Sequence, residues 1–510
     1  MTFARKIGAE RPKEIALRDE NNEYTWLEVD DNLNRAANGL LEMDLGDDNR
    51  IAVFAENSAE TAFANLAGLI SGASVVPVNF HLAADEVAYI LNDSNAKVLF
   101  SDANTLERAM DAAQQSKVHT LIAWDVDSQE GVVVWEDWMA KNSPDDPADD
   151  MPPLPNLLYT SGTTGFPKGT PLPPTMFAGG ETVAEHLTNL AAPIAQGGAG
   201  VHLVVGPMYH TGPLSGARGL AGGQCSVILG RFDAEKTLKA IEDYSIGNSV
   251  MVPTHFVRLL ALPEEVREKY DVSSLIRIPH TGAKCPVDVK RAMIDWWGPV
   301  FFDAYGASEV GTTCSITSEE WLEHPGSVGR SVPPFRAIIL DDEGNELNAN
   351  EEGRLFFEDS TGRGIIYHNA PEKTAEAHIA PGVFTLGEIA YMDDDGYVYI
   401  TDRFSDMIVS GGVNIYPAEA EQVLIHHSHV LDIACIGVPH PEMGEELKAL
   451  VIVKNSDDLP DPKDLLDWCR ERLSHYKCPR SVEFVSSIGR NTMGKVNKRK
   501  LRAPYWEGHE

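Results

Sequence analysis

A loop rich in glycine and hydroxyl residues, YTSGTTGFPKG, spans residues 159–169 and follows an apolar run that predicts a strand. Small residues let backbone N–H groups approach phosphate oxygens closely, and hydroxyl and ammonium groups add further donors. The loop lacks the spacing of a Walker loop, because Pro167 precedes the lysine and Gly169 follows it. A flexible surface loop is the alternative, but the density of donors favours phosphate contact. The predicted contacts are Ser161, Gly162, Thr163, Thr164, Gly165 and Lys168.

A second segment, DAYGASEVG at residues 303–311, combines an aromatic ring with a carboxylate. Tyr305 follows an apolar strand and stands beside Gly306, so its ring could stack on a nucleotide base; a buried core tyrosine is the alternative. Glu309 offers carboxylate oxygens, which hard cations such as Mg²⁺ prefer. An exposed loop glutamate is the alternative interpretation of that residue.

The C-terminal segment 490–502 is basic and contains no acid. Such a cluster is unusual in a chain with 42 basic and 77 acidic residues and a formal net charge of −35. It predicts either a solvated basic terminus or a contact with an anion. The charged members are Arg490, Lys495, Lys498, Arg499, Lys500 and Arg502.

The overall composition excludes several classes of protein. The negative field would repel nucleic acid and anionic lipid over most of the surface. The acidity fits a salt-loving host or an ordinary enzyme equally well. The six cysteines show no C-x-x-C spacing, no apolar signal segment is visible, and the apolar run 66–80 is interrupted by Ser71, Ser74 and Pro77. We therefore expect a cytoplasmic protein with reduced thiols and no membrane span.

Short β-branched runs alternate with helical patterns along most of the chain. The runs 51–55, 74–78, 97–100, 120–124 and 156–160 predict buried strands, with amphipathic helices between them. This rhythm predicts an α/β fold in which helices cover parallel sheets. From 354 to 401 the pattern has period two and predicts antiparallel strands, and a compact unit follows after residue 402.

Four segments, in order along the chain, resemble the AMP-forming adenylate-forming superfamily, which includes acyl-CoA synthetases, luciferases and nonribosomal adenylation domains. They are residues 159–169, 303–311, 399–421 and 491–502. The resemblance implies a large N-terminal domain of helix-covered sheets with a small β-barrel-like part, residues 1–401. It also implies a hinge at 402–405 and a small, mobile α/β lid at 406–510.

By resemblance, Lys495 is the catalytic lysine, acting with Thr160 and Glu309, and Glu309 also holds magnesium. A lysine there would neutralise the substrate carboxylate and the α-phosphate together. Glu388 stands where the family usually has an aspartate that binds the ribose, so a longer side chain takes this place; a solvent-facing glutamate is the alternative. The remaining nucleotide contacts implied by the resemblance are Gly282, Ala283, Lys284, Asp303, Ala304, Tyr305, Gly306, Ser308 and Arg403.

The resemblance places the hinge at Ser405, where the family commonly has a charged residue. Gly411 and Gly412 suit a narrow tunnel for the pantetheine arm of coenzyme A, and a tight turn is compatible with the same role. His210 stands where amino-acid-activating relatives tend to carry an aspartate, which argues against an amino-acid substrate. The expected lining of the acid pocket is His210, Phe256, Thr281 and Gly306.

These expectations describe an ATP-dependent carboxylate–CoA ligase that forms an acyl-AMP intermediate and uses Mg²⁺. The acid is expected to be medium- or long-chain, cyclic or aromatic. Alternatives are the same adenylation with a carrier-protein or amine acceptor, a luciferase-like oxygenase, and a nucleotide-binding relative that has lost turnover. The oligomeric state stays open, with a homodimer as one alternative.

Overall fold

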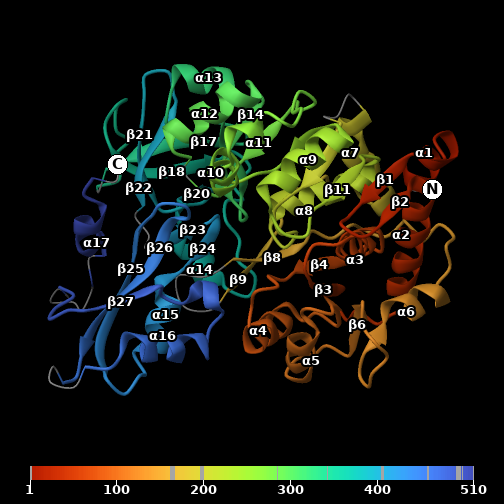
Figure 1. Ribbon diagram of the computed structural model, residues 1–510, viewed down its shortest axis with the longest axis horizontal. Helices are drawn as coiled ribbons and strands as arrows, with labels where there is room; N and C mark the ends of the chain where they lie inside the picture. The colour runs from red at the N-terminus through yellow and green to blue at the C-terminus, as the bar shows by residue number, and fades with distance from the viewer. Residues whose placement is uncertain are drawn as a thin grey trace.

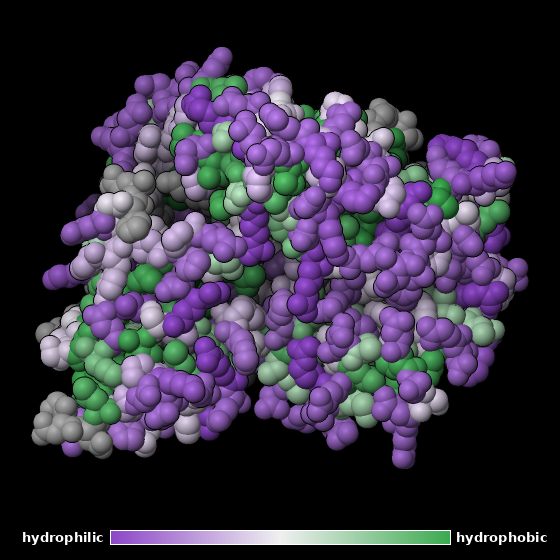
Figure 2. All heavy atoms as spheres, viewed as in Figure 1, coloured by the Kyte–Doolittle hydropathy of each residue, from purple (hydrophilic) through white to green (hydrophobic). Residues whose placement is uncertain are grey.

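The computed structural model describes residues 3–160, 167–195, 200–283, 285–341, 343–403, 407–455, 459–489, 496 and 498–508. Figure 1 shows a large N-terminal part and a smaller C-terminal part, drawn in blue, that packs beside it. The α/β class expected from the alternating pattern is confirmed. Figure 2 shows that the visible face is mostly hydrophilic.

The first sheet is parallel and has the strand order β4-β3-β5-β6-β7. Its strands are β3 (Arg50–Phe54), β4 (Ser74–Pro77), β5 (Val98–Asp102), β6 (Thr120–Trp124) and β7 (Val133–Val134). Side chains alternate along β3, so Ile51 and Val53 join one core cluster while Ala52 and Phe54 join another. Both faces are therefore covered by helices, which explains why these strands are apolar throughout. The helices are α3 (Ala59–Ile70), α4 (Ala84–Ser94), α5 (Leu106–Gln114) and α6 (Trp135–Lys141).

The second sheet has the order β12-β10-β11-β1-β2, and all its pairs are parallel except β1 with β2. Its strands are β1 (Ile15–Arg18), β2 (Glu23–Thr25), β10 (Val201–Val204), β11 (Ser226–Ile228) and β12 (Ile246–Ser249). The helices and the short 3₁₀ turn around it are α1 (Phe3–Glu10), α2 (Trp26–Leu41), α7 (Val183–Ala195), α8 (Thr211–Arg218), η1 (Gly219–Gly222) and α9 (Ala234–Tyr244).

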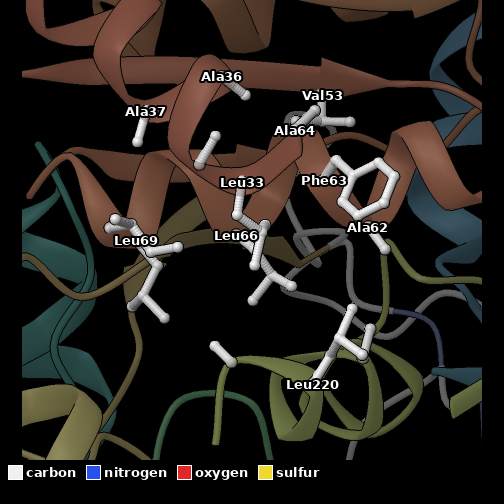
Figure 3. Packing of buried hydrophobic residues seen from close by; sticks show 14 of the residues in the cluster. Leu33, Ala36, Ala37, Val53, Ala62, Phe63, Ala64, Leu66, Leu69 and Leu220 are labelled. Carbon is white, nitrogen blue, oxygen red and sulfur yellow. The ribbon is translucent and has the colours of Figure 1, made fainter. Parts of the chain in front are cut away.

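Helices α2 and α3 pack in the core cluster that joins these two sheets. Figure 3 shows Leu33, Ala36 and Ala37 of α2 facing alanines and leucines of α3, with Leu220 of η1 below them. Small side chains let the helices approach closely, and dense packing of this kind stabilises the interior. Thr25 caps the N-terminus of α2: its side chain accepts a hydrogen bond from the Glu28 N–H, while the Glu28 carboxylate accepts one from the Thr25 N–H.

The strands that carry the candidate site belong to a hairpin, a four-stranded sheet and the six-stranded sheet described after them. A hairpin is formed by β8 (Leu157–Thr160) and β9 (Lys168–Pro171). A four-stranded sheet contains β13 (Ile278–His280), β14 (Phe301–Ala307), β15 (Gly311–Thr317) and β16 (Arg330–Ser331). Helices α10 (Pro253–Leu260), α11 (Glu264–Arg267), α12 (Val287–Trp297) and α13 (Ser318–Glu323) accompany it.

The period-two stretch forms the antiparallel strands expected of it. The six-stranded sheet contains β17 (Phe335–Leu340), β18 (Gly353–Asp359), β19 (His378–Ala380), β20 (Val383–Phe384), β21 (Glu388–Met392) and β22 (Val398–Arg403), with α14 (Pro371–Glu376) beside it. Among the described strands no pairing closes this sheet into a barrel.

The C-terminal part has its own sheet and core. Its strands β23 (Ile408–Ser410), β24 (Val413–Ile415), β25 (Val430–His440), β26 (Gly444–Val453) and β27 (Ser481–Phe484) pair in one sheet. Helices α15 (Pro417–Leu424), α16 (Pro462–Arg470) and α17 (Lys498–Trp506) and the turn η2 (His475–Lys477) complete it. Within the described parts of the chain, no helix combines the length and apolar character needed to cross a bilayer.

Candidate functional site

The β8–β9 hairpin carries the two ends of the predicted phosphate loop. Thr160 and Lys168 are paired residues of the two strands, so the loop leaves and re-enters the sheet at one point. The ammonium of Lys168 lies 5.1 Å from the centre of the Tyr367 ring, and burial lowers the pKa of this lysine. The predicted phosphate contacts Ser161, Gly162, Thr163, Thr164 and Gly165 lie outside the described residues.

Glu309 lies directly beside this hairpin. The hydroxyl of Thr160 donates a hydrogen bond of 3.0 Å to Glu309 Oε1. Burial raises the pKa of Glu309, while the hydrogen bond from Thr160 and the charge of Lys168 oppose that rise. The structure thus brings together Thr160, Lys168 and Glu309, which the sequence motifs had each singled out. Their carboxylate and hydroxyl oxygens are ligand types that fit a magnesium ion.

Tyr305 and Glu388 form a second contact nearby. The Tyr305 hydroxyl donates a hydrogen bond of 2.7 Å to Glu388 Oε2. Only 6% of Glu388 is exposed, so the alternative of a solvent-facing glutamate is wrong. Glu388 on β21 is also the backbone partner of Arg403 on β22. A buried carboxylate and an aromatic ring therefore adjoin, and a carboxylate of this kind can accept two hydrogen bonds from a diol.

Strand β14 requires glycine at Gly306, near its end. A Cβ atom there would lie 2.0 Å from the carbonyl oxygen of Gly311, because β14 and β15 approach closely at a register shift. The turn that follows contains Ser308 and leads to Glu309. Only glycine permits this approach, so the geometry that places Glu309 depends on it.

Beneath this site lies a buried ion pair that the sequence did not reveal. Lys290 of α12, which is 1% exposed, lies with Nζ 3.2 Å from Asp303 Oδ2 on β14. His280 Nε2 is 3.7 Å from the same oxygen, and burial lowers the pKa of His280 to about 4. Asp303 therefore keeps a fixed positive partner, while His280 is neutral at ordinary pH. A lone lysine in an amphipathic helix gives no signal of this role.

The predicted acid-pocket residues lie in different surroundings. His210 directly precedes α8, and burial lowers its pKa to about 4, so it is uncharged near neutrality. Thr281 of the predicted acid pocket is partly buried. Of the neighbouring residues predicted to contact the nucleotide, Ala283 is partly buried, Gly282 is exposed and Lys284 lies outside the described residues. Phe256 is fully buried in the core, with its ring edge-on to His280 at 5.4 Å.

Two further residues adjoin Glu309 and were missed from the sequence. Tyr367 lies close enough to Glu309 to act on its pKa, and burial together with the charge of that carboxylate raises the pKa of the Tyr367 hydroxyl. Arg363 donates a 3.3 Å hydrogen bond to the Glu309 backbone oxygen. Both belong to the segment after β18, which packs against β9 through a hydrogen bond from the His368 N–H to the Gly169 oxygen. No local pattern marks them, because their role comes from this long-range contact.

The predicted tunnel residues lie at the contact between the two domains. Gly411 and Gly412 form the two-residue turn between β23 and β24, and both have positive φ, as a tight hairpin requires. A Cβ atom on Gly412 would lie 3.3 Å from the Val252 side chain of the large domain. The predicted hinge Ser405 and catalytic Lys495 are outside the described residues, and Val496 packs in the apolar cluster of Ala434 and Ile436.

Comparison with known families agrees with this geometry. The AMP-binding enzyme model matches residues 4–362, and the model of the AMP-binding enzyme C-terminal domain matches residues 419–495. The chain belongs to the AMP-binding enzyme family, so the adenylate-forming resemblance seen in its motifs is confirmed.

Individual relatives place the chain more closely. Feruloyl-CoA synthase of Amycolatopsis sp is 31% identical, with 96% of each chain covered. The long-chain-fatty-acid–CoA ligase FadD13 of Mycobacterium tuberculosis is 30% identical over 94% of this chain and 93% of its own. These relatives bear out the expected class, an AMP-forming acid–thiol ligase.

Among solved structures, the amide bond synthetase McbA from Marinactinospora thermotolerans is 26% identical, with a TM-score of 0.83. The match covers 99% of this chain and 100% of McbA. Its similarity extends over both domains, so the large and small domains expected from the sequence are confirmed.

Proposed function

We propose that this chain is an ATP-dependent carboxylate–CoA ligase that works through an acyl-AMP intermediate. The observation that carries the proposal is the convergence of Thr160, Lys168 and Glu309 at one end of the β8–β9 hairpin. The Tyr305–Glu388 pair adds the groups expected for a nucleoside.

In the first step the substrate carboxylate attacks the α-phosphorus of ATP, and the bond to diphosphate breaks. The loop from Ser161 to Lys168 holds the departing phosphates through backbone N–H groups, hydroxyls and one ammonium. Lys495 neutralises the carboxylate and the α-phosphate as their bond forms. Glu309 and Thr160 would hold a magnesium ion, which supplies positive charge beside the phosphates. No residue forms a covalent bond to the acyl group; positioning and electrostatics supply the catalysis.

In the second step the thiol of coenzyme A loses its proton and attacks the acyl carbonyl carbon, and AMP departs. We assign the large domain to residues 1–401 and the small domain to 406–510, with rotation about Ser405 between the steps. The contact of Gly412 with Val252 supports an arrangement in which the glycine turn faces the large domain for this second step.

For the acid, we propose a medium- or long-chain, cyclic or aromatic carboxylate. The support is chemical and comparative: His210 is neutral, so it offers no charge to an ammonium group, and two relatives are named for feruloyl and long-chain fatty acyl products. The similarity to an amide bond synthetase favours one second candidate, in which an amine replaces the thiol as acceptor.

The test is ATP–diphosphate exchange across aliphatic, aromatic and polycyclic acids, with AMP and product followed with and without coenzyme A. Exchange with one class of acid and thioester formed only with coenzyme A is the expected result. Exchange without thioester, but with amide formed from an added amine, would support the second candidate. Tight ATP binding without exchange for any acid would contradict both.

A further inference from the structure

A buried charge cluster joins the two domains at the turn η2. Lys477 Nζ lies 2.6 Å from Glu86 Oε1 on α4 of the large domain and 2.9 Å from Glu419 Oε2 on α15 of the small domain. The side chains of Lys477, Glu86 and Glu419 are only 3%, 14% and 2% exposed. One lysine thus holds two carboxylates, one from each domain.

Hydrogen bonds around the cluster also cross between the domains. The Ser474 hydroxyl donates to Glu86 Oε2, and the Ala83 N–H donates to the Ser474 oxygen at 3.1 Å. The Asn79 amide donates to the Tyr476 hydroxyl at 3.2 Å. These contacts join the start of α4 to residues 474–477, and they exist only while the domains are docked in this way.

The charges make the cluster sensitive to the loss of its lysine. Without Lys477, Glu86 and Glu419 would face one another across the contact with no buried cation between them. Two carboxylates in a site of low polarity repel strongly, and the simplest relief is for the domains to separate so that water reaches both.

We propose that Lys477 is a positioning residue for thiol transfer, which holds the small domain on α4 while the turn of Gly411 and Gly412 faces Val252. The proposal rests on the assignment of this domain arrangement to the second step. Lys477 touches no reacting atom in this scheme; it acts by fixing where the glycine turn lies.

The first arm of the test measures the half-reactions separately. Diphosphate exchange reports adenylation, and thioester formation from supplied octanoyl-AMP or cinnamoyl-AMP with coenzyme A reports thiol transfer. Lys477→Met is expected to slow thiol transfer about tenfold or more and to change exchange by no more than about twofold. Adding Glu86→Gln to Lys477→Met is expected to restore part of the rate, because the repulsion between the two carboxylates is removed.

The second arm measures the domain arrangement without any substrate. Spin labels at Gln114 on α5 and Lys463 on α16, both exposed, report the distance between the domains in a Cys225→Ser background, since the other cysteines are buried. A narrow distribution in the parent chain should broaden or shift in Lys477→Met and narrow again in the double variant. If Lys477→Met does not fold, Glu86→Gln and Ser474→Ala alone test the same contact from its two sides.

Lys448→Met is the matched control, because Lys448 is a partly buried lysine that pairs with Glu483 inside the small domain only. This variant should leave the interdomain distances unchanged, and also the ratio between the rates of thiol transfer and diphosphate exchange. Unchanged distances in Lys477→Met, equal loss of both half-reactions, or strictly additive effects of Lys477→Met and Glu86→Gln would overturn the proposal. If the distances shift as expected but the parent chain accepts neither acyl-AMP, the role of Lys477 in holding the domains together is supported and the proposed acid class is wrong.

Discussion

Two buried lysines, Lys290 and Lys477, serve different regions of this molecule. Lys290 pairs with Asp303 inside the large domain, beneath the strand that carries Tyr305. Lys477 pairs with Glu86 and Glu419 across the contact between the domains. The first pair persists whatever the small domain does, whereas the second depends on one domain arrangement. Under the proposed domain rotation, similar chemistry would give a permanent support in one region and a contact that forms and breaks in the other.

The largest expected effect is that of Lys495→Ala, which should impair adenylation and leave thiol transfer intact. Lys495→Ala should lower diphosphate exchange about 10³-fold, because the charge that brings two anions together is removed. Thioester formation from supplied acyl-AMP should stay near the parent rate, since the thiol step does not need this lysine. Equal loss of both half-reactions would contradict the division of labour between two arrangements.

The next largest effect is expected for Glu309→Gln, a change confined to the large domain. Glu309→Gln should lower exchange about 10²-fold, because the charge facing the phosphates is lost. In the metal-free chain burial raises the pKa of Glu309, so at limiting Mg²⁺ exchange should fall on acidification at a pH above the usual glutamate range, because protons then compete with the metal for this carboxylate. The variant should lack that acidic limb. Glu319→Gln, on the exposed surface of α13, is the control and should retain it.

A smaller effect distinguishes the two lysines directly. Lys290→Met leaves Asp303 partly buried without its cation, which should lower the free energy of unfolding by about 3 kcal/mol. The KM for ATP should rise about tenfold in exchange assays, because Asp303 borders the proposed base site. Unlike Lys477→Met, this variant should leave the distance between the domains unchanged. Calorimetry, exchange kinetics and the spin-label distances check these three statements, and a shifted distance would contradict the contrast between the two lysines.

The smallest effect concerns an exposed contact between the same domains. Arg258 and Glu442 form an ion pair of 2.8 Å, but their side chains are 40% and 50% exposed. Arg258→Gln should change the free energy of unfolding by less than about 0.5 kcal/mol and thiol transfer by less than about twofold, because water screens the pair. Thermal unfolding and the thioester assay measure both. A loss of thiol-transfer rate as large as that of Lys477→Met would show that the exposed and the buried ion pair matter equally for this step.

Much of the fold was predictable because it follows local patterns. The apolar runs that became β3 to β6 alternate with amphipathic helices, and the parallel sheet follows from that order. The period-two stretch likewise became antiparallel strands. The predicted barrel-like part was visible in the sequence only as alternating strands, since strand closure depends on pairings between distant segments that local alternation does not specify.

The site was predictable where its residues lie in motifs. Thr160, Lys168 and Glu309 come from two segments recognised in the sequence, and the structure brings them together. Lys290 and Tyr367 were missed, because each lies in an ordinary helix or loop pattern and gains its role from packing. The interdomain cluster was missed for the same reason.

The sequence by itself determined the family, the strand and helix order and the loops proposed to approach the nucleotide, because these depend on residue type and short spacing. Only the tertiary structure decided which distant groups meet. Tyr305 reaches Glu388 across 83 residues, and Lys477 reaches Glu86 across 391. A buried charge is stable only beside its partner, and the complete folded chain determines where that partner lies.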